Sequence, residues 1–185
     1  MKTLETKRCI LRPVTLKDTN ELFECYNQDV VVKYLPLKRH NSIRDTKKFI
    51  KSFFLKNYKN NKIGHFAIVY KNNNKVIGHV GFNNISPSAK EGDIGICINP
   101  SYWGQNLCEE LCQELLRYGF EELHLEKIIA DIYKDNKYSK KTLEILGFTF
   151  EETFNKNISL NSHVLCNKYQ MSKHDYFKLK SGYKV

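Results

Sequence analysis

The sequence predicts helices layered on a central sheet, in the mixed α/β or α+β class. Two observations predict it: short apolar or alternating segments of strand length recur along the chain, and segments with helical spacing of apolar residues separate them. The 185 residues suffice for one domain that buries roughly 70% of its unfolded surface. A composition that is 41% hydrophobic and 27% charged is ordinary for a globular protein and excludes collagen-like or disordered classes.

The first third of the chain contains one strand and two helices. Residues 9–13 are predicted as a strand that Pro13 ends, and Thr15 with Asp18 has the spacing of a capping box at a helix start. A second helix is expected to begin near Ser42. Residues 30–35 are apolar but short and precede a proline, so we expect a loop or bent turn.

The remaining elements follow from the same two periodicities. Residues 71–75 form a turn cluster between two predicted strands, and Gly147 is placed to end a helix. The expected strands are residues 64–70, 76–82, 93–98, 127–133, 148–154 and 164–171. The expected helices are a long one carrying Leu107, Leu111 and Leu115, and a shorter one over residues 136–146.

The net charge of +10 favours anionic partners without choosing among them. Part of it is solvated surface in a chain rich in Lys and Asn. Two basic stretches stand out, and one of them begins the helix near residue 137. Their members are Lys33, Lys38, Arg39, Arg44, Lys47, Lys48 and Lys51, and then Lys137, Lys140 and Lys141.

The six cysteines show no ligand spacing with the histidines and form no C-x-x-C pair, so no metal site is expected. In a reducing compartment they are expected to be buried small apolar groups. No apolar run reaches membrane-spanning length, and the first ten residues are too charged for a secretory signal. We therefore expect a cytoplasmic protein.

The segment from Asp93 to Glu110 is the most informative. A strand passes through a turn containing Pro100 into the N-terminus of the long helix. Amides of a first helical turn lack intrahelical partners, and the helix dipole is positive there. Such a junction suits a pyrophosphate or another anion, although many α/β loops share the pattern.

The stretch GICINPSYWGQNLCEELCQELLRYGFEELHLEKIIADIYKDNKYSKKTLEILGF resembles the core of the GNAT acyl-CoA N-acyltransferases. Within that superfamily it looks most like the RimJ/RimL type, which acetylates N-terminal amines of ribosomal proteins. The matching motifs are Tyr102-Trp103-Gly104, then Asn136 with Ser139, and Leu143 to Phe148. The resemblance covers residues 7–171 and implies a GNAT fold: a mixed, mostly antiparallel twisted sheet flanked by helices.

The resemblance implies an acetyl-CoA site with no metal. The acetyl-pantetheine arm would lie along Ile96, Cys97 and Ile98, and Asn136 would bond it. Amides from Gln105 to Glu109 would hold the pyrophosphate. The full set of expected cofactor-binding residues is Ile96, Cys97, Ile98, Trp103, Gly104, Gln105, Asn106, Leu107, Cys108, Glu109, Asn136, Ser139 and Lys141.

This chain departs from the family pattern at two positions of the cofactor turn. Asn106 replaces a glycine, but Asn tolerates a left-handed backbone better than other residues with a side chain. Cys108 replaces a Gly or Ala, which is a modest intrusion. We expect an adjusted acetyl-CoA site rather than an abolished one.

Three residues are candidates for catalysis by direct attack of an amine on the thioester. Ser139 would hydrogen-bond the leaving thiolate, because Leu143 stands where many of these enzymes carry a Tyr. Asp93 or Asp131 would relay the amine proton through water. At pH 7, neutralising an α-amine costs about 1 kcal/mol and a lysine amine about 4–5 kcal/mol, which mildly favours an N-terminal acceptor.

Several alternatives remain open from the sequence. The enzyme could instead acetylate a polyamine or an antibiotic, or the chain could be a non-catalytic module that binds CoA or RNA. Nucleic acid is an unlikely main partner, because no RNA-binding motif is recognisable. Tyr34, Leu35, Phe54 and Tyr58 could line an acceptor cleft or simply pack helices. We expect a single acetyltransferase domain over residues 1–172, a basic tail over 173–185, and a monomer or homodimer.

Overall fold

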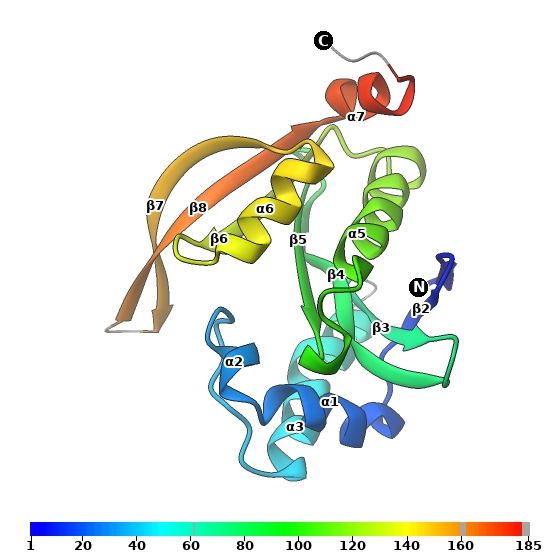
Figure 1. Ribbon diagram of the computed structural model, residues 1–185, viewed down its shortest axis with the longest axis vertical. Coiled ribbons are helices and arrows are strands. Elements are labelled where there is room, and N and C mark those ends of the chain that lie inside the picture. The colour runs from blue at the N-terminus through cyan, green and yellow to red at the C-terminus, as the bar shows by residue number, and fades with distance from the viewer. Residues whose placement is uncertain (61, 160–161, 183–185) are drawn as a thin grey trace. The chain divides into compact units, whose positions relative to one another are not determined.

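The computed structural model describes residues 1–60, 62–159 and 162–182 (Figure 1). The chain divides into two compact units. The first comprises Met1–Asn84 and Gly95–Glu114, and the second comprises Ile85–Ile94 and Leu115–Val185. Strand β5 (Glu91–Ile98) and helix α5 (Leu107–Arg117) each contribute residues to both units.

The strands form an eight-stranded sheet in the order β1-β2-β3-β4-β5-β6-β8-β7. Neighbours β5 and β6 are parallel, with Asp93 opposite Ile129, whereas the β1–β2, β2–β3, β3–β4, β6–β8 and β7–β8 pairs are antiparallel. The predicted mixed, mostly antiparallel sheet is confirmed. The other strand bounds are β1 Leu4–Glu5, β2 Cys9–Pro13, β3 His65–Tyr70, β4 Lys75–Ser86, β6 Lys127–Tyr133, β7 Thr149–Ser159 and β8 Ser162–Ser172.

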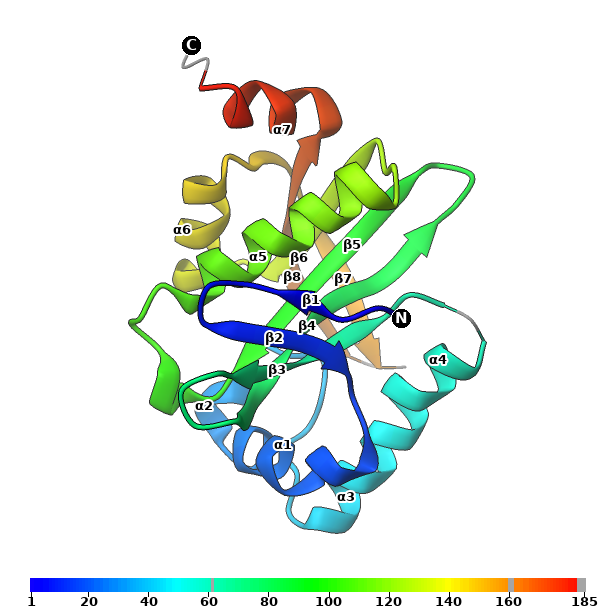
Figure 2. The same cartoon turned by 90° about the vertical axis from the view of Figure 1, so that its right-hand side faces the viewer.

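The helices begin where the sequence supplies caps. Thr15 and Asp18 form the expected capping box, and Ser42 and Asp45 form another at the start of α3. From α3 the chain stays helical through the wider turn η2 to the end of α4 (Figure 2). The bounds are η1 Leu16–Asp18, α1 Thr19–Tyr26, α2 Asp29–Val32, α3 Ile43–Phe49, η2 Ile50–Leu55, α4 Lys56–Lys59, η3 Pro100–Tyr102, η4 Tyr118–Glu122, α6 Lys137–Leu146 and α7 Lys173–Lys180.

Two local expectations need correction. The segment of residues 30–35 was expected to be a loop or bent turn, but Asp29–Val32 forms a helical turn with Val31 buried. The segment after Ser172, expected to be a basic tail, begins with helix α7, whose Tyr176 ring stacks on Phe120 at 4.9 Å. Residues 183–185 lie outside the described residues.

The core of the first unit contains a buried histidine pair. His65 on β3 and His79 on β4 face each other with their Nδ1 atoms 2.9 Å apart, and His65 Nε2 lies 3.0 Å from Oδ1 of Asn83. Two protonated Nδ1 atoms would repel at this distance, so at least one ring is neutral. Burial lowers the pKa of His65 to about 4, and burial followed by the nearby His65 lowers that of His79 well below its ordinary value.

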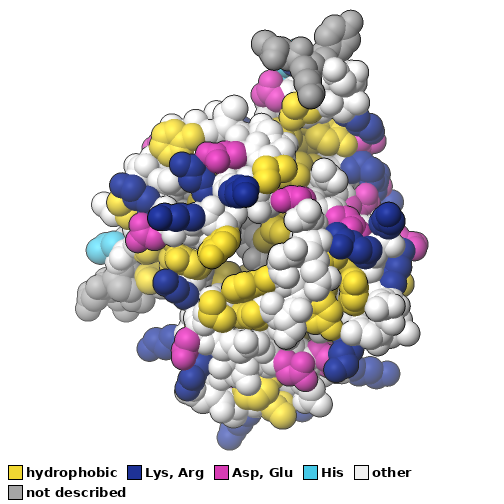
Figure 3. Space-filling model, in the orientation of Figure 1, with side chains coloured by type: hydrophobic (Ala, Val, Ile, Leu, Met, Phe, Trp, Pro, Cys, Tyr) yellow, Lys and Arg dark blue, Asp and Glu magenta, His cyan; other side chains and the backbone are white. Residues whose placement is uncertain are grey.

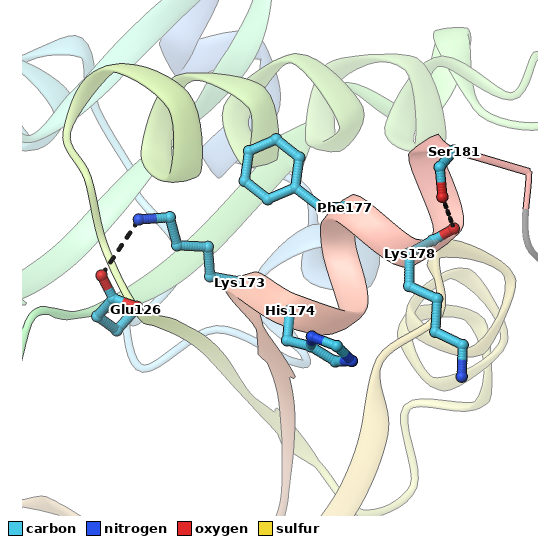
Figure 4. Close-up of a pocket in the computed structure, with 6 residues that line it drawn as sticks. All are labelled: Glu126, Lys173, His174, Phe177, Lys178 and Ser181. Atoms are coloured by element: carbon cyan, nitrogen blue, oxygen red, sulfur yellow. Dashed lines mark hydrogen bonds and ion pairs between the residues drawn. The ribbon is translucent and has the colours of Figure 1, made fainter.

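The second unit encloses a shallow hollow beside α7 (Figure 4). Its lining residues are Glu126, Lys173, His174, Phe177, Lys178 and Ser181, and Lys173 pairs with Glu126 at 3.2 Å.

Gly147 adopts the left-handed conformation with a φ of 90° and ends α6, as expected. Within the described residues, no helix is long and apolar enough to cross a membrane.

We predict that Gly78→Ala strongly destabilises the protein. A Cβ at Gly78 would lie 2.0 Å from the carbonyl oxygen of Cys97, so β4 or β5 would have to move. We expect a loss of about 3 kcal/mol or more in the free energy of unfolding, measured by urea denaturation. The control is Gly104→Ala, where φ is 74° but no atom lies within 4 Å, and about 1 kcal/mol is expected. Equal losses would contradict the steric explanation.

We also predict that stability falls as the pH drops from about 6.5 towards 4. The unfolded histidines bind protons near pH 6.5, whereas the folded pair resists protonation, so the unfolded state binds more protons in this range. Each histidine contributes up to about 1.4 kcal/mol per pH unit, present above pH 6.5 and lost below it. Urea unfolding at several pH values measures the slope. The variant His174→Gln, which replaces an exposed histidine, should show the same slope. A free energy of unfolding that does not change between pH 6.5 and 4 would refute this explanation.

Candidate functional site

The predicted site residues fall into two groups, one in each unit. In the first unit, the end of β5 leads into a short turn before α5. The amide of Asn99 donates to the carbonyl of Ile77 at 2.7 Å, and Nε1 of Trp103 donates to the carbonyl of Ile98 at 2.8 Å. These bonds fix the two ends of the turn while leaving the Trp103 ring 48% exposed.

The turn itself needs two left-handed residues. Gly104 has a φ of 74° and Asn106 a φ of 55°, so Asn106 adopts the conformation that glycine normally supplies at this position. Residues 103–106 are exposed, and α5 begins at Leu107, which is buried. The first-turn amides of a helix carry partial positive charge and suit a diphosphate.

An ion pair that the sequence reasoning missed anchors this turn. Arg8, just before β2, donates from its backbone amide and its Nε to the carboxylate of Glu110 at 2.8 and 2.6 Å. Its guanidinium also donates to the carbonyl of Gln105 at 2.8 Å. Burial opposes ionisation of Glu110, but hydrogen bonds from Thr6 and Arg8 outweigh it and lower its pKa. One arginine thus ties the turn and the first turn of α5 to the strand region.

Cys108, the second departure from the family pattern, is partly buried. A hydrogen bond between the thiols of Cys112 and Cys108, together with burial, raises the pKa of Cys112 well above its ordinary value. The sulfur of Cys108 therefore engages the next turn of its own helix.

The strand that was expected to hold the acetyl-pantetheine arm has few polar side chains to offer. Cys97 and Ile98 are buried and Ile96 is partly buried, so polar contacts along this strand must come from its backbone. Burial raises the pKa of the Cys97 thiol well above its ordinary value, which favours the neutral thiol there.

In the second unit, the two candidate bases lie on one face of the sheet. Asp93 is opposite Ile129, and Asp131 follows two residues later on the same side of β6. Lys156 on β7 forms an ion pair with Asp131 at 2.8 Å. Burial lowers the pKa of Lys156, but the hydrogen bond and charge of Asp131, and then the charge of Asp93, raise it above its ordinary value.

The start of α6 carries the remaining predicted residues. Oδ1 of Asn136 accepts a hydrogen bond from the amide of Ser139 at 3.1 Å and so caps the helix, which leaves its amide nitrogen as the donor for a ligand. Lys141 is exposed, whereas Lys140 lies 3.8 Å from Glu144. Leu143 is buried, so no phenol is available there.

The possible acceptor-cleft residues of the first unit divide between two roles. Phe54 is 1% exposed and packs edge-on against His79 at 5.2 Å. The hydroxyl of Tyr58 accepts from the amide of Val14 at 3.1 Å and donates to the carbonyl of His65. These two side chains hold the unit together, and Tyr34 and Leu35 are partly exposed.

Among the described residues there is no group of His, Cys, Asp or Glu arranged to hold a metal. Five of the six cysteines are buried and all are reduced. Sequence patterns could not reveal Arg8, Glu110 or Lys156, because each meets a partner distant in sequence.

Comparison with known proteins identifies the family. Residues 8–149 match the family described as "Acetyltransferase (GNAT) domain". "Uncharacterized N-acetyltransferase p20" of Bacillus licheniformis is 32% identical over 154 residues, 82% of this chain and 84% of that protein.

Two solved structures extend the comparison. Microcin C7 self immunity acetyltransferase MccE, in complex with acetyl-CoA and AMP, has a TM-score of 0.78 and 27% identity, covering 90% of this chain and 93% of that one. Ribosomal-protein-S5-alanine acetyltransferase from Vibrio fischeri has a TM-score of 0.78 at 20% identity, covering 95% and 99%, and shares the fold. With its sheet, its left-handed turn into α5 and this match, the chain belongs to the GNAT family of N-acetyltransferases.

Proposed function

We propose that the protein transfers the acetyl group of acetyl-CoA to a primary amine, and that this amine is the N-terminus of a protein. The observation that carries the cofactor assignment is the left-handed turn at Gly104 and Asn106, anchored by Arg8 and Glu110 at the start of α5. The amides from Gln105 to Glu109 would hold the pyrophosphate. We include the other expected cofactor-binding residues, among them Lys141, in this proposal.

The reaction needs a neutral amine, a donor for the oxyanion and a hydrogen bond to the leaving sulfur. Backbone amides of Ile96 to Ile98 would polarise the thioester carbonyl, and Ser139 would bond the thiolate. The new N–C bond forms as the C–S bond breaks, the amine proton passes to a carboxylate, and the thiolate takes up a proton. We assign the carboxylate to Asp93, because it lies on β5, the strand whose residues Ile96 to Ile98 would hold the thioester.

The acceptor assignment rests on proton chemistry and charge. An α-amine is easier to neutralise than a lysine amine by about 3–4 kcal/mol at pH 7, which matters for a site with a single carboxylate base. The net charge of +10 counts against a polycationic acceptor such as a polyamine. The likeness in fold to a ribosomal-protein acetyltransferase accords with this acceptor class.

We further propose that residues 1–172 act as one acetyltransferase domain, since the family match spans residues of both units. Six cysteines without a disulfide fit a reducing compartment, and we assign the protein to the cytoplasm, as a monomer or homodimer.

We predict that acetyl-CoA changes the fluorescence of Trp103, the only tryptophan in the sequence, because it lies in the proposed cofactor turn. Glu110→Gln should raise the Kd from this titration about tenfold, since it breaks the charged hydrogen bonds that anchor the turn. The matched control is Glu5→Gln, which removes the exposed partner of Lys71. No binding by the unmodified protein at high micromolar acetyl-CoA would refute the cofactor assignment.

We predict that Asp93→Asn lowers kcat/KM about 10²-fold and removes the acidic limb of its pH profile, with a peptide N-terminal amine as acceptor and thiol release as the readout. Ser139→Ala should lower kcat by a similar factor. The control is Glu91, which lies on the same strand and pairs with Lys127 at 2.7 Å. Glu91→Gln should have little effect on kcat or kcat/KM.

The same assay tests the acceptor. Faster turnover with spermidine or an aminoglycoside than with peptide amines would replace the N-terminal acceptor by a small-molecule one. Unchanged turnover in Asp93→Asn and Ser139→Ala would refute the catalytic roles assigned to these two residues. Cofactor binding without turnover on any amine would indicate a non-catalytic module.

A further inference from the structure

The continuous helix formed by α3, η2 and α4 presents a solvent face made almost entirely of cations. We call this surface the basic helix face; its members are Arg44, Lys47, Lys48, Lys51, Lys56 and Lys59, all exposed. In Figure 3, Lys and Arg side chains project from the lower rim of the molecule, where α2 and α3 lie. Residues 52–55 separate Lys56 and Lys59 from the basic stretch that ends at Lys51. Only the folded helix places these two lysines on the same surface as that stretch.

These cations are not neutralised by neighbours. Asp45 is the one acidic residue in the helix, and its carboxylate is taken up by the capping box, accepting from the amides of Asn41 and Ser42 and from the Ser42 hydroxyl. No ion pair within the described residues involves a member of the basic helix face.

In the second unit, ion pairs between lysines and carboxylates are frequent. Six of its lysines lie in ion pairs with carboxylates, at 2.6 to 3.8 Å. They are Lys127, Lys140, Lys156, Lys168, Lys173 and Lys180. The helix that carries the basic helix face holds six cations and one carboxylate, which is about half of the chain's net charge of +10.

The other side of this helix identifies the kind of partner. Ile50 and Phe54 are fully buried in the core of the first unit, so no apolar side remains to enter a lipid bilayer. Ile43, the first residue of α3, is the one exposed large apolar side chain in this helix, whereas a protein interface needs an apolar core and is depleted of lysine.

This helix also has no exposed aromatic side chain. That argues against binding to single-stranded nucleic acid, because proteins that bind single strands stack the bases on aromatic rings. Phe49 and Phe53 on this helix stack on each other at 5.0 Å and are partly buried. What remains is a row of point charges about 20 Å long, with about 5 Å of rise between successive turns. Phosphates of a nucleic-acid strand repeat at a similar spacing, with one charge per 3.4 Å of axis on each strand of a duplex.

We propose that the basic helix face binds the sugar-phosphate backbone of double-stranded nucleic acid, without regard to sequence. Five of its six cations are lysines, which contact phosphates as point charges and lack the fork geometry that arginine uses to read bases. This surface shares no residue with the proposed acetyl-CoA site, so the two proposals concern different side chains.

The test is fluorescence anisotropy with a labelled DNA duplex of 24 base pairs at several salt concentrations. With four to six phosphate contacts, log K should fall against log[salt] with a slope of about −3.6 to −5.4. Scrambling the sequence should leave the affinity unchanged. A triple variant, Lys47→Gln with Lys48→Gln and Lys51→Gln, should weaken binding at least tenfold and reduce the slope by about 3.

The matched control removes three other exposed lysines, by Lys17→Gln, Lys75→Gln and Lys178→Gln, and should keep the slope of the unmodified protein. Both variants should retain the Trp103 response to acetyl-CoA, which shows that they are folded and separates this proposal from the enzymatic one. Equal losses in the two variants would overturn the proposal, as would tighter binding to poly-glutamate or to a single strand of the same length than to the duplex.

Discussion

A close contact between two strands governs the placement of the cofactor strand. Gly78 on β4 lies so near the carbonyl of Cys97 on β5 that a methyl group would approach that oxygen to 2.0 Å. The hydrogen bond from Asn99 to Ile77 continues the same approach to the end of β5. These contacts with β4 hold the end of β5 in place. The direction in which the chain leaves β5 is therefore fixed before α5 begins.

The turn is then held from a second side by Arg8. A single guanidinium contacts Gln105 within the turn and Glu110 within the helix, so the left-handed residue between them, Asn106, is held in place. Left-handed backbone at Asn106 costs free energy, and an anchor of this kind offsets that cost. This chain has Asn106 and Cys108 where the family has small residues. Asn106 accepts the left-handed conformation, and the thiol of Cys108 is hydrogen-bonded with that of Cys112.

Charge is organised differently in the two units. In the second unit, several lysines pair with carboxylates across strands and along α6, and one of these pairs joins Lys156 to Asp131. In the first unit, the cations of the basic helix face have no such partners among the described residues. Opposed charges at short range stabilise the ionised state of both groups, whereas unopposed cations on one surface produce a long-range field that attracts polyanions.

The sequence by itself determined the main strand and helix order, the capping box at Thr15 and Asp18, the hairpin at residues 71–75, the stop at Gly147 and the turn into α5, because these depend on local spacing and on residues with special backbone preferences. It also marked the acetyltransferase motifs. It missed the helical turn at residues 29–32 and helix α7, where burial of Val31 and stacking of Tyr176 on Phe120 outweigh weak local patterns. Only the tertiary structure decided that Arg8 meets Glu110, that Lys156 meets Asp131, and that six cations share one helix face without partners. Such contacts join residues up to about a hundred positions apart, and periodicity within a segment carries no information about them.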